Sequence, residues 1–159
     1  MKDTAHDIAG VIARPPLLYA GFFLAGVALD YLWPLDMLRE LPAAARYVAA
    51  AALFLIGSAF AVPAFFGFRA AGTNVPTWLP TTALVTGGPY RFSRNPIYVG
   101  LSLAYVSLAL ALAAAWSLVL LAPLLVVMRY GVIAREEAYL ARKFGAAYAS
   151  YKASVRRWL

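Results

Sequence analysis

Cysteine is absent from the chain, and histidine occurs only once, at position 6. Disulfide bonds, thiolate metal sites and cysteine nucleophiles are therefore excluded, and one chain cannot supply several histidine ligands to a metal. We expect no metal site. A histidine-dependent catalytic triad would need His6 to fold back from an N-terminus that shows no secondary-structure pattern.

Charge is also scarce, since only 13% of the 159 residues are charged, 64% are hydrophobic and the mean hydropathy is +0.73. Soluble domains have about a quarter charged residues and about half apolar ones. The composition thus excludes a disordered or collagen-like chain and disfavours an ordinary soluble globule. The net charge is +7. In a membrane protein such an excess first reflects orientation in the bilayer, and we expect no nucleic-acid partner.

Long apolar runs dominate the sequence. A helix rises about 1.5 Å per residue and a bilayer core is about 30 Å thick, so one span needs about 20 residues. Residues 95–128 carry no charge and are too long for one span, which predicts a turn near residues 113–117. The sequence therefore predicts an all-α, polytopic membrane helix bundle. It forms a single membrane domain, 1–159, with four transmembrane helices at about 17–34, 47–68, 96–114 and 116–134.

Basic residues predict the orientation of this bundle. They lie before the first span, in segment 69–95 and after residue 134. The positive-inside rule then places both termini and segment 69–95 in the cytoplasm, in what we expect to be a bacterial inner membrane. The first apolar run is too long for a signal-peptide core and lacks a clear small-residue cleavage site, so we expect it to be retained as a span.

The C-terminal tail carries an apolar stripe flanked by arginine and lysine. Its members follow one another at spacings of four, four, three and four residues, which predicts a cytoplasmic amphipathic helix. Such a helix either lies on anionic lipid headgroups or folds back over the cytoplasmic mouth of the bundle, and the two are compatible. Membrane lipids are therefore expected partners. The stripe consists of Leu140, Phe144, Tyr148, Tyr151 and Val155.

The stretch 82–100 combines glycine, proline, aromatic and arginine residues directly before the third predicted span. Glycine lets the backbone approach a ligand closely, and Pro96 suits the first turn of a helix. The free N–H groups of that turn, together with Arg94, could bind an anionic group such as a carboxylate. Aromatic faces suit a purine or a cationic sulfonium. The alternative is a turn with interfacial aromatics and arginines that only set the orientation.

Charged residues at or inside the spans leave further alternatives open. Glu136 and Glu137 are unusual at a cytoplasmic membrane flank; they either pair with arginines in a structural network or hold a bound ammonium. Asp30 either reaches the outer interface or is a functional intramembrane carboxylate. Arg129 lies more than a turn inside the last helix, so it either snorkels to the cytoplasmic side or points at an acidic substrate group.

Residues 88–100, the Glu136-Glu137 pair and the tail pattern resemble the superfamily of isoprenylcysteine carboxyl methyltransferases and phospholipid methyltransferases, which are integral-membrane enzymes. The resemblance covers about residues 82–158. It implies S-adenosylmethionine as the methyl donor, bound in a pocket that faces the cytoplasm. The motif Arg-His-Pro-x-Tyr of the superfamily is matched by residues 94–98, where Asn95 replaces the histidine. Asparagine can hydrogen-bond but cannot take a charge, which disfavours an acid–base role there.

Carried over residue by residue, the resemblance implies a cofactor-binding half, 82–158. In it Glu136 is the expected partner of the cofactor's ammonium and Glu137 its neighbour or a second ligand. Glu137 and Arg129 are the candidate catalytic residues. Family members that act on prenylated cysteine carry an arginine where this chain has Val132, which disfavours that substrate. The cofactor-binding residues implied are Thr82, Ala83, Leu84, Val85, Gly88, Tyr90, Arg94, Asn95, Pro96, Ile97, Tyr98 and Glu136.

The sequence therefore predicts methyl transfer from S-adenosylmethionine to a lipophilic acceptor. The acceptor could be an isoprenoid carboxylate, a phospholipid amine or a hydrophobic thiol. One alternative is a small four-helix transporter or a non-catalytic membrane partner protein, with Asp30 and Arg129 as intramembrane charges. Another is a family member that binds the cofactor without chemistry, for which Asn95 is the only hint.

Overall fold

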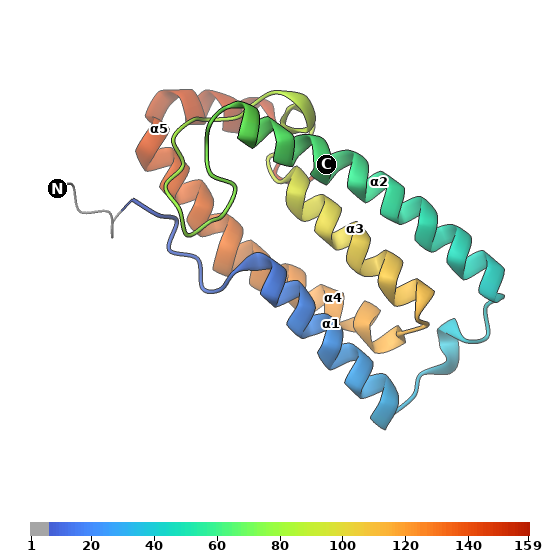
Figure 1. Cartoon of the computed structure of the whole chain (residues 1–159). Coiled ribbons are helices and arrows are strands. Elements are labelled where there is room, and N and C mark those ends of the chain that lie inside the picture. The colour runs from blue at the N-terminus through green and yellow to red at the C-terminus, as the bar shows by residue number, and fades with distance from the viewer. Residues whose placement is uncertain (1–6) are drawn as a thin grey trace.

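The computed structural model describes residues 7–159, so His6 lies outside the described residues. The described part of the chain is helical and contains no strand, as the all-α prediction required (Figure 1). Two 3-10 turns, η2 (Asp36–Leu38) and η3 (Gly88–Arg91), and one π-helical segment, η4 (Met128–Ile133), complete it. The helices are α1 (Pro15–Leu32), α2 (Ala43–Ala70), α3 (Pro96–Ala111), α4 (Ala115–Val127) and α5 (Ala134–Ser154).

Three helical stretches are long and apolar enough to cross a membrane. They are α1, α2 and the continuous run from Ala115 to Ser154, which joins α4, η4 and α5. The fourth apolar helix, α3, has 16 residues. The helices thus make the chain an integral membrane protein, while the count of four spans stays a prediction.

The charge-free run 95–128 does turn back on itself close to the predicted place. Helix α3 ends at Ala111 and α4 begins at Ala115, with Ala113 between them at a positive φ of 52°. The backbone N–H of Trp116 donates a hydrogen bond of 3.0 Å to Oδ2 of Asp30. Asp30 is buried and satisfies one of the free N–H groups at the start of α4, a structural role that the sequence did not reveal.

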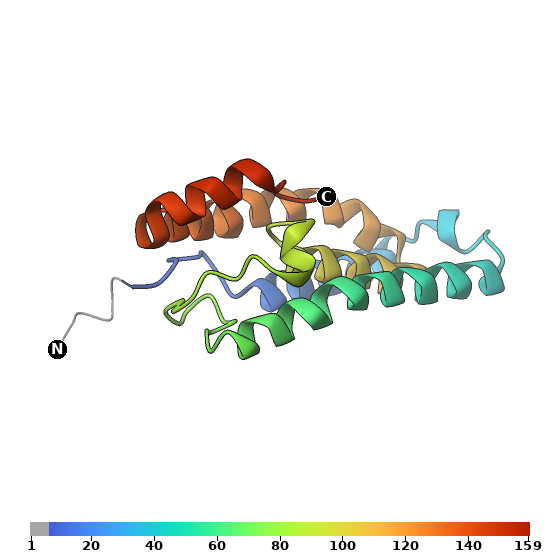
Figure 2. The ribbon, with the colours of Figure 1, turned by 90° about the horizontal axis from the view of Figure 1, so that it is seen from above.

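Small residues bring α2 and α3 into close contact along their length (Figures 1 and 2). A Cβ atom at Gly100 would lie 2.7 Å from the carbonyl oxygen of Gly57, so only glycine fits at this crossing. The hydroxyl of Ser107 donates to the carbonyl of Ala50 at 2.7 Å. Small residues and interhelical hydrogen bonds of this kind hold helices together in membranes, and here they hold α3 against α2 in an antiparallel pair.

Helix α5 reverses direction at Gly145, whose φ of 51° and ψ of −123° break the helix. Glycine reaches this region without steric cost. Residues 146–154, which we name the return helix, then run back over one end of the bundle (Figure 2). The apolar stripe of the tail packs here against Ala64, Phe68 and Tyr90. The structure therefore has the stripe folded over the bundle, the second of the two interpretations of that pattern.

Candidate functional site

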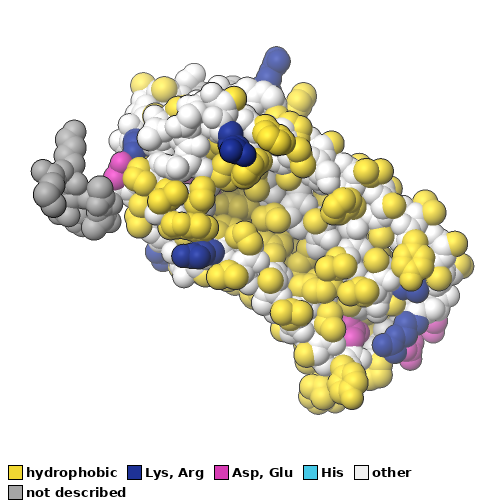
Figure 3. Space-filling model, viewed as in Figure 1, with side chains coloured by type: hydrophobic (Ala, Val, Ile, Leu, Met, Phe, Trp, Pro, Cys, Tyr) yellow, Lys and Arg dark blue, Asp and Glu magenta, His cyan; other side chains and the backbone are white. Residues whose placement is uncertain are grey.

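A cavity of about 710 Å³ lies at the end of the bundle where α3 begins. Its volume is typical of small-molecule sites. The end of α2, the start of α3 and the start of α5 form its walls, and the loop 71–87 and the return helix close it. Figure 3 shows a hollow among hydrophobic side chains on the face between α1 and α2. The cavity is mostly apolar, with a few polar and charged groups in its lining.

Most of the predicted site residues line this cavity although they come from separate parts of the chain. Segment 83–98 contributes lining residues from the loop and from the start of α3, and α5 contributes the acidic pair. The predicted residues that line the cavity are Ala83, Leu84, Val85, Tyr90, Arg94, Asn95, Ile97, Tyr98, Glu136 and Glu137.

Four predicted residues do not line the cavity. The hydroxyl of Thr82 donates to the carbonyl of Gly72 at 3.1 Å, which shapes the loop. Gly88 is exposed and has a φ of 58°, and Pro96 is fully buried at the start of α3. Arg129 is exposed, and its guanidinium lies 5.5 Å from the ring of its neighbour Tyr130. Arg129 therefore does not point into the cavity, and whether it snorkels to the cytoplasmic side stays a prediction.

Glu136 presents its carboxylate to the cavity with one hydrogen-bond partner. The hydroxyl of Tyr98 donates to Oε1 of Glu136 at 2.7 Å. In the described residues no arginine or lysine forms an ion pair with this carboxylate. A carboxylate in an apolar cavity loses hydration that a cation would compensate. The position is therefore suited to a cationic group of a ligand.

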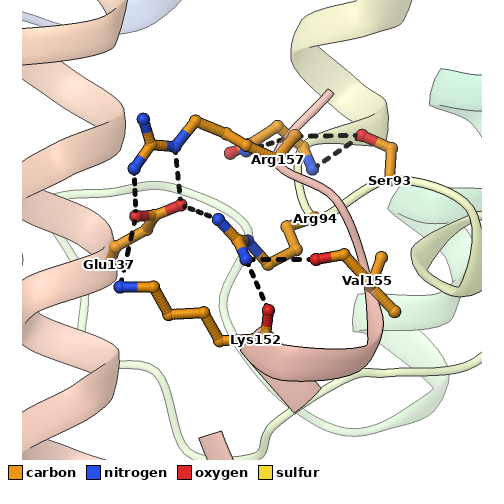
Figure 4. A network of polar contacts seen from close by, with 7 residues as sticks. Ser93, Arg94, Glu137, Lys152, Val155 and Arg157 are labelled. Atoms are coloured by element: carbon orange, nitrogen blue, oxygen red, sulfur yellow. Dashed lines mark hydrogen bonds and ion pairs between the residues drawn. The ribbon is translucent and has the colours of Figure 1, made fainter. Parts of the chain in front are cut away.

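Glu137 has the opposite environment, because arginines occupy both of its oxygens (Figure 4). Arg94 donates from Nη2 at 2.9 Å, and Arg157 donates from Nε at 2.9 Å and from Nη2 at 2.7 Å. The ammonium of Lys152 lies 4.0 Å away. The two interpretations of the acidic pair thus divide between its members: Glu137 belongs to a structural network, while Glu136 is left facing the cavity.

The backbone of the C-terminal tail is held by the residues just before α3. Arg94 donates from Nη1 to the carbonyls of Lys152 and Val155 at 2.9 and 3.1 Å. Asn95, at the position of the family's histidine, donates from Nδ2 to the carbonyl of Arg157 at 2.8 Å, and Ser93 donates to the same oxygen at 3.3 Å. We name these contacts, together with the Glu137 network, the tail clasp. It keeps the return helix in place over the cavity.

Aromatic side chains form much of the remaining wall. Tyr90 packs edge-on against Phe68 at 5.4 Å, and its carbonyl accepts a hydrogen bond of 2.8 Å from the hydroxyl of Tyr151. Burial raises the pKa of the Tyr90 phenol, with smaller contributions from Tyr151 and Glu136. Tyr90 therefore stays neutral at physiological pH and offers an aromatic face, not a base.

The sequence did not reveal the wall formed by residues 73–81 of the loop and the end of α2. Phe65, Phe68 and Arg69 line the cavity, although a phenylalanine-rich helix end looks the same as a lipid-facing surface. In the loop, Thr77 and Trp78 line the cavity, and the hydroxyl of Thr77 is buried without a partner. Loop residues show no periodicity, so only the cluster of proline, tryptophan and threonine could have drawn attention to them.

Residues 45–147 match the family model of the phospholipid methyltransferases. The matched segment contains most of α2, all of α3 and α4, the acidic pair and the turn at Gly145, and it covers well over half of the chain. The fold and the cavity define an integral-membrane protein with a cavity at one end of its helix bundle. The chain belongs to the phospholipid methyltransferase family.

Other comparisons add no relatives. No curated protein and no solved structure matches the chain. Within residues 7–159 no cluster of histidine, aspartate and glutamate side chains could hold a metal ion.

Proposed function

We propose that the protein transfers a methyl group from S-adenosylmethionine to a lipophilic acceptor inside this cavity. The chain then crosses a bacterial inner membrane four times, with both termini and the cavity on the cytoplasmic side. Membership of the family supports a methyltransferase. The observation that carries the proposal is Glu136, a carboxylate that faces the cavity with Tyr98 as its only hydrogen-bond partner in the described residues.

Polar atoms in the cavity lining match the charges of the donor. Glu136 suits the ammonium of an amino acid group. Arg94, whose Nε is buried without a partner, suits the carboxylate. The faces of Tyr90, Tyr98 and Tyr148 suit a purine and a sulfonium cation. The cavity therefore offers partners for the ammonium, the carboxylate, the purine and the sulfonium of the cofactor.

When bound there, S-adenosylmethionine supplies an electrophilic methyl group on a sulfonium. The chain's own part is to align the partners and to exclude water, and alignment alone can lower a barrier by about 7–11 kcal/mol. Tyr98 orients Glu136 through its hydroxyl, and the apolar walls keep water out. No acid–base residue is needed for a carboxylate, thiolate or neutral amine acceptor, which fits the presence of Asn95 instead of histidine.

We assign Glu137 a positioning role, because both of its oxygens already accept hydrogen bonds from arginines. Arg129 has no part in the proposed reaction, since it lies outside the cavity. A transporter would need intramembrane charges that face a path. Asp30 instead accepts a backbone hydrogen bond at the start of α4.

The acceptor reaches the cavity sideways from the bilayer in this proposal. Pro15 and Pro16 of α1 lie on one edge of the opening, and Phe65, Phe68 and Arg69 of α2 lie on the other. These edges are apolar apart from Arg69. Isoprenoid carboxylates, phospholipid amines and hydrophobic thiols remain the three acceptor classes to be compared.

The test is a thermal-shift titration of the detergent-solubilised protein with S-adenosylmethionine and its demethylated product. At 100 times its dissociation constant, a ligand stabilises the folded state by about 2.7 kcal/mol. The variant E136Q should lose most of this stabilisation, whereas E40Q, an exposed carboxylate outside the cavity, should retain it. Transfer of a radiolabelled methyl group to one of the three acceptor classes should accompany binding.

Two results would overturn the proposal. One is the absence of stabilisation by the donor together with no transfer to any of the three classes. The other is normal donor binding by E136Q, which would remove the assigned role of that residue. Ion flux in liposomes that D30N abolishes would favour the transporter instead.

A further inference from the structure

Residues 7–14, which we name the strap, lie along α5 and η4 before the start of α1 (Figure 1). The backbone N–H of Ile12 donates to the carbonyl of Gly131 at 3.1 Å. Arg135 donates from Nη1 to the carbonyl of Gly10 at 2.9 Å. The strap is thus docked on the helix that carries the acidic pair, although it is far from that helix in sequence.

The docking site is the π-helical segment η4. A π-turn shifts the helical hydrogen-bond register, and such segments are frequent at functional sites. Here the carbonyl of Gly131 is available to Ile12, and the missing side chain of Gly131 leaves room for the Ile12 side chain. A Cβ atom at Gly131 would collide with Ile12. The irregular segment and its glycine therefore form a seat for the strap.

The outer end of the strap is held by an ion pair. The carboxylate of Asp7 accepts a hydrogen bond of 2.6 Å from the ammonium of Lys143, and its backbone carbonyl accepts one of 3.1 Å from the hydroxyl of Tyr139. Tyr139 lines the cavity, and its hydroxyl also accepts a hydrogen bond from the backbone N–H of Thr81. One tyrosine thus connects the strap, α5 and loop 71–87.

The inner end of the strap reaches the rim of the cavity. The guanidinium of Arg14 lies 4.4 Å from the ring of Trp78, an arrangement typical of a cation–π contact. Trp78 and the adjacent Pro15 and Pro16 line the cavity, and Trp78 is 41% exposed, which places it at the edge. Arg14 therefore holds an aromatic side chain at the opening through which an acceptor would enter.

The strap is attached more weakly than the helices. The side chain of Asp7 is 47% exposed and Ile12 is 53% exposed. Exposed ion pairs contribute little to stability, and segments with few buried apolar contacts open at a low free energy. The strap can therefore undock while the helices and the tail clasp stay in place.

We propose that the strap is a gate for the methyl acceptor. While it is docked on η4, Arg14 holds Trp78 at the rim and narrows the opening between α1 and α2. When it undocks, Trp78 is released and the opening widens. Arg14 and Trp78 then determine the width of the acceptor that can pass. This inference rests on the proposed function, because it concerns the route of the acceptor.

The cysteine-free chain allows a direct test by a disulfide between I12C and G131C. A Cβ atom at Gly131 would lie 2.8 Å from Cγ1 and 3.7 Å from Cγ2 of Ile12. In I12C a cysteine Sγ can take the place of Cγ1, within reach of an S–S bond of about 2.05 Å to a cysteine at position 131. In mixed micelles with a total lipid extract and radiolabelled donor, we expect the oxidised protein to transfer methyl groups at least tenfold more slowly. Reduction should restore the rate, and I12C alone should not respond to the oxidant.

Donor stabilisation separates this inference from the proposed function. It should be equal in the oxidised and reduced forms, because neither Ile12 nor Gly131 lines the cavity. Equal transfer rates in both forms, or loss of donor stabilisation on oxidation, would overturn the gate. Absence of both transfer and donor stabilisation in the reduced form would overturn the proposed function itself.

A second measurement needs no activity. Thr77→Cys places the only thiol of the chain in the cavity, where a bulky pyrene maleimide must pass the rim to react. We expect the labelling rate to rise at least fivefold when R14Q or K143Q is added. The matched control R39Q, an exposed arginine outside the cavity, should leave the rate unchanged. Unchanged labelling in both strap variants would overturn the gate.

Discussion

The hydroxyl of Tyr98 donates a hydrogen bond of 2.7 Å to Oε1 of Glu136, and this contact joins the start of α3 to the start of α5. In the described residues, neither the hydroxyl of Tyr98 nor the carboxylate of Glu136 has another side-chain hydrogen-bond partner. Glu136 is thereby fixed at the cavity wall. The site depends on this pair for two reasons. The hydroxyl of Tyr98 orients the carboxylate of Glu136. In the described residues no arginine or lysine forms an ion pair with that carboxylate.

Removing the hydroxyl of Tyr98 should weaken donor binding more than it weakens the fold. Y98F keeps the aromatic ring and leaves Glu136 without its partner. A hydrogen bond to a charged group contributes about 1.5–3 kcal/mol, so we expect the dissociation constant of the donor to rise at least tenfold. Calorimetric titration with the demethylated product measures this. Y31F, an exposed tyrosine, serves as the control, and equal affinities in the two variants would contradict the role of Tyr98.

Breaking the Glu137 network should destabilise the fold. Glu137 and Arg94 have side chains only 9% and 10% exposed. E137Q leaves two arginines without a counter-charge, and loss of one partner of a buried pair costs about 3–5 kcal/mol. We expect a clear fall in the thermal unfolding temperature, smaller for R157Q, whose side chain is 28% exposed. The exposed Arg156 provides the control R156Q, and an unfolding temperature of E137Q equal to that of R156Q would show that the network is dispensable.

The difference between the two glutamates illustrates what the sequence could and could not predict. Their presence beside a span marked them as unusual, because carboxylates are rare at that flank. Adjacent residues on a helix point about 100° apart. Glu136 can therefore face the cavity while Glu137 faces the tail. Which of them does so depends on where Arg94 and Arg157 lie, and that is a property of the tertiary structure.

Other parts of the fold also separate into features that the sequence could predict and features that depend on tertiary contacts. The turn between α3 and α4 was predictable, because the length of a charge-free run is limited by the thickness of the bilayer. The capping role of Asp30 was not predictable, since its partner Trp116 lies on another helix. The strap and the loop around Trp78 were also missed, because segments without periodicity carry no signal of what they contact.

Asn95 offers a test of whether the family's histidine position serves the tail in this chain. Its Nδ2 donates to the carbonyl of Arg157. N95D replaces this donor by an acceptor, and an unsatisfied buried polar pair costs about 1–3 kcal/mol. We expect N95D to lower the unfolding temperature and to expose the tail to limited proteolysis. N95H keeps a donor and should behave like the parent protein. Equal protection of the tail in N95D and the parent would contradict this role.

The Asp7–Lys143 pair should make the docking of the strap depend on pH. The hydrogen bond from Lys143 lowers the pKa of Asp7 below its usual 3.8, against a smaller effect of burial. A group whose pKa is lower in the folded state stabilises that state above its unfolded pKa, and this contribution is lost as the pH falls through the folded pKa. The parent protein should therefore unfold at a slightly higher temperature than D7N at pH 7, and the difference should vanish below the folded pKa of Asp7. Lysine keeps its charge over this range, so Asp7 alone sets the transition. D36N, which removes an exposed carboxylate of another ion pair, controls for the loss of one charge. A difference between D7N and the parent that persisted unchanged into acid would show that the carboxylate does not hold the strap.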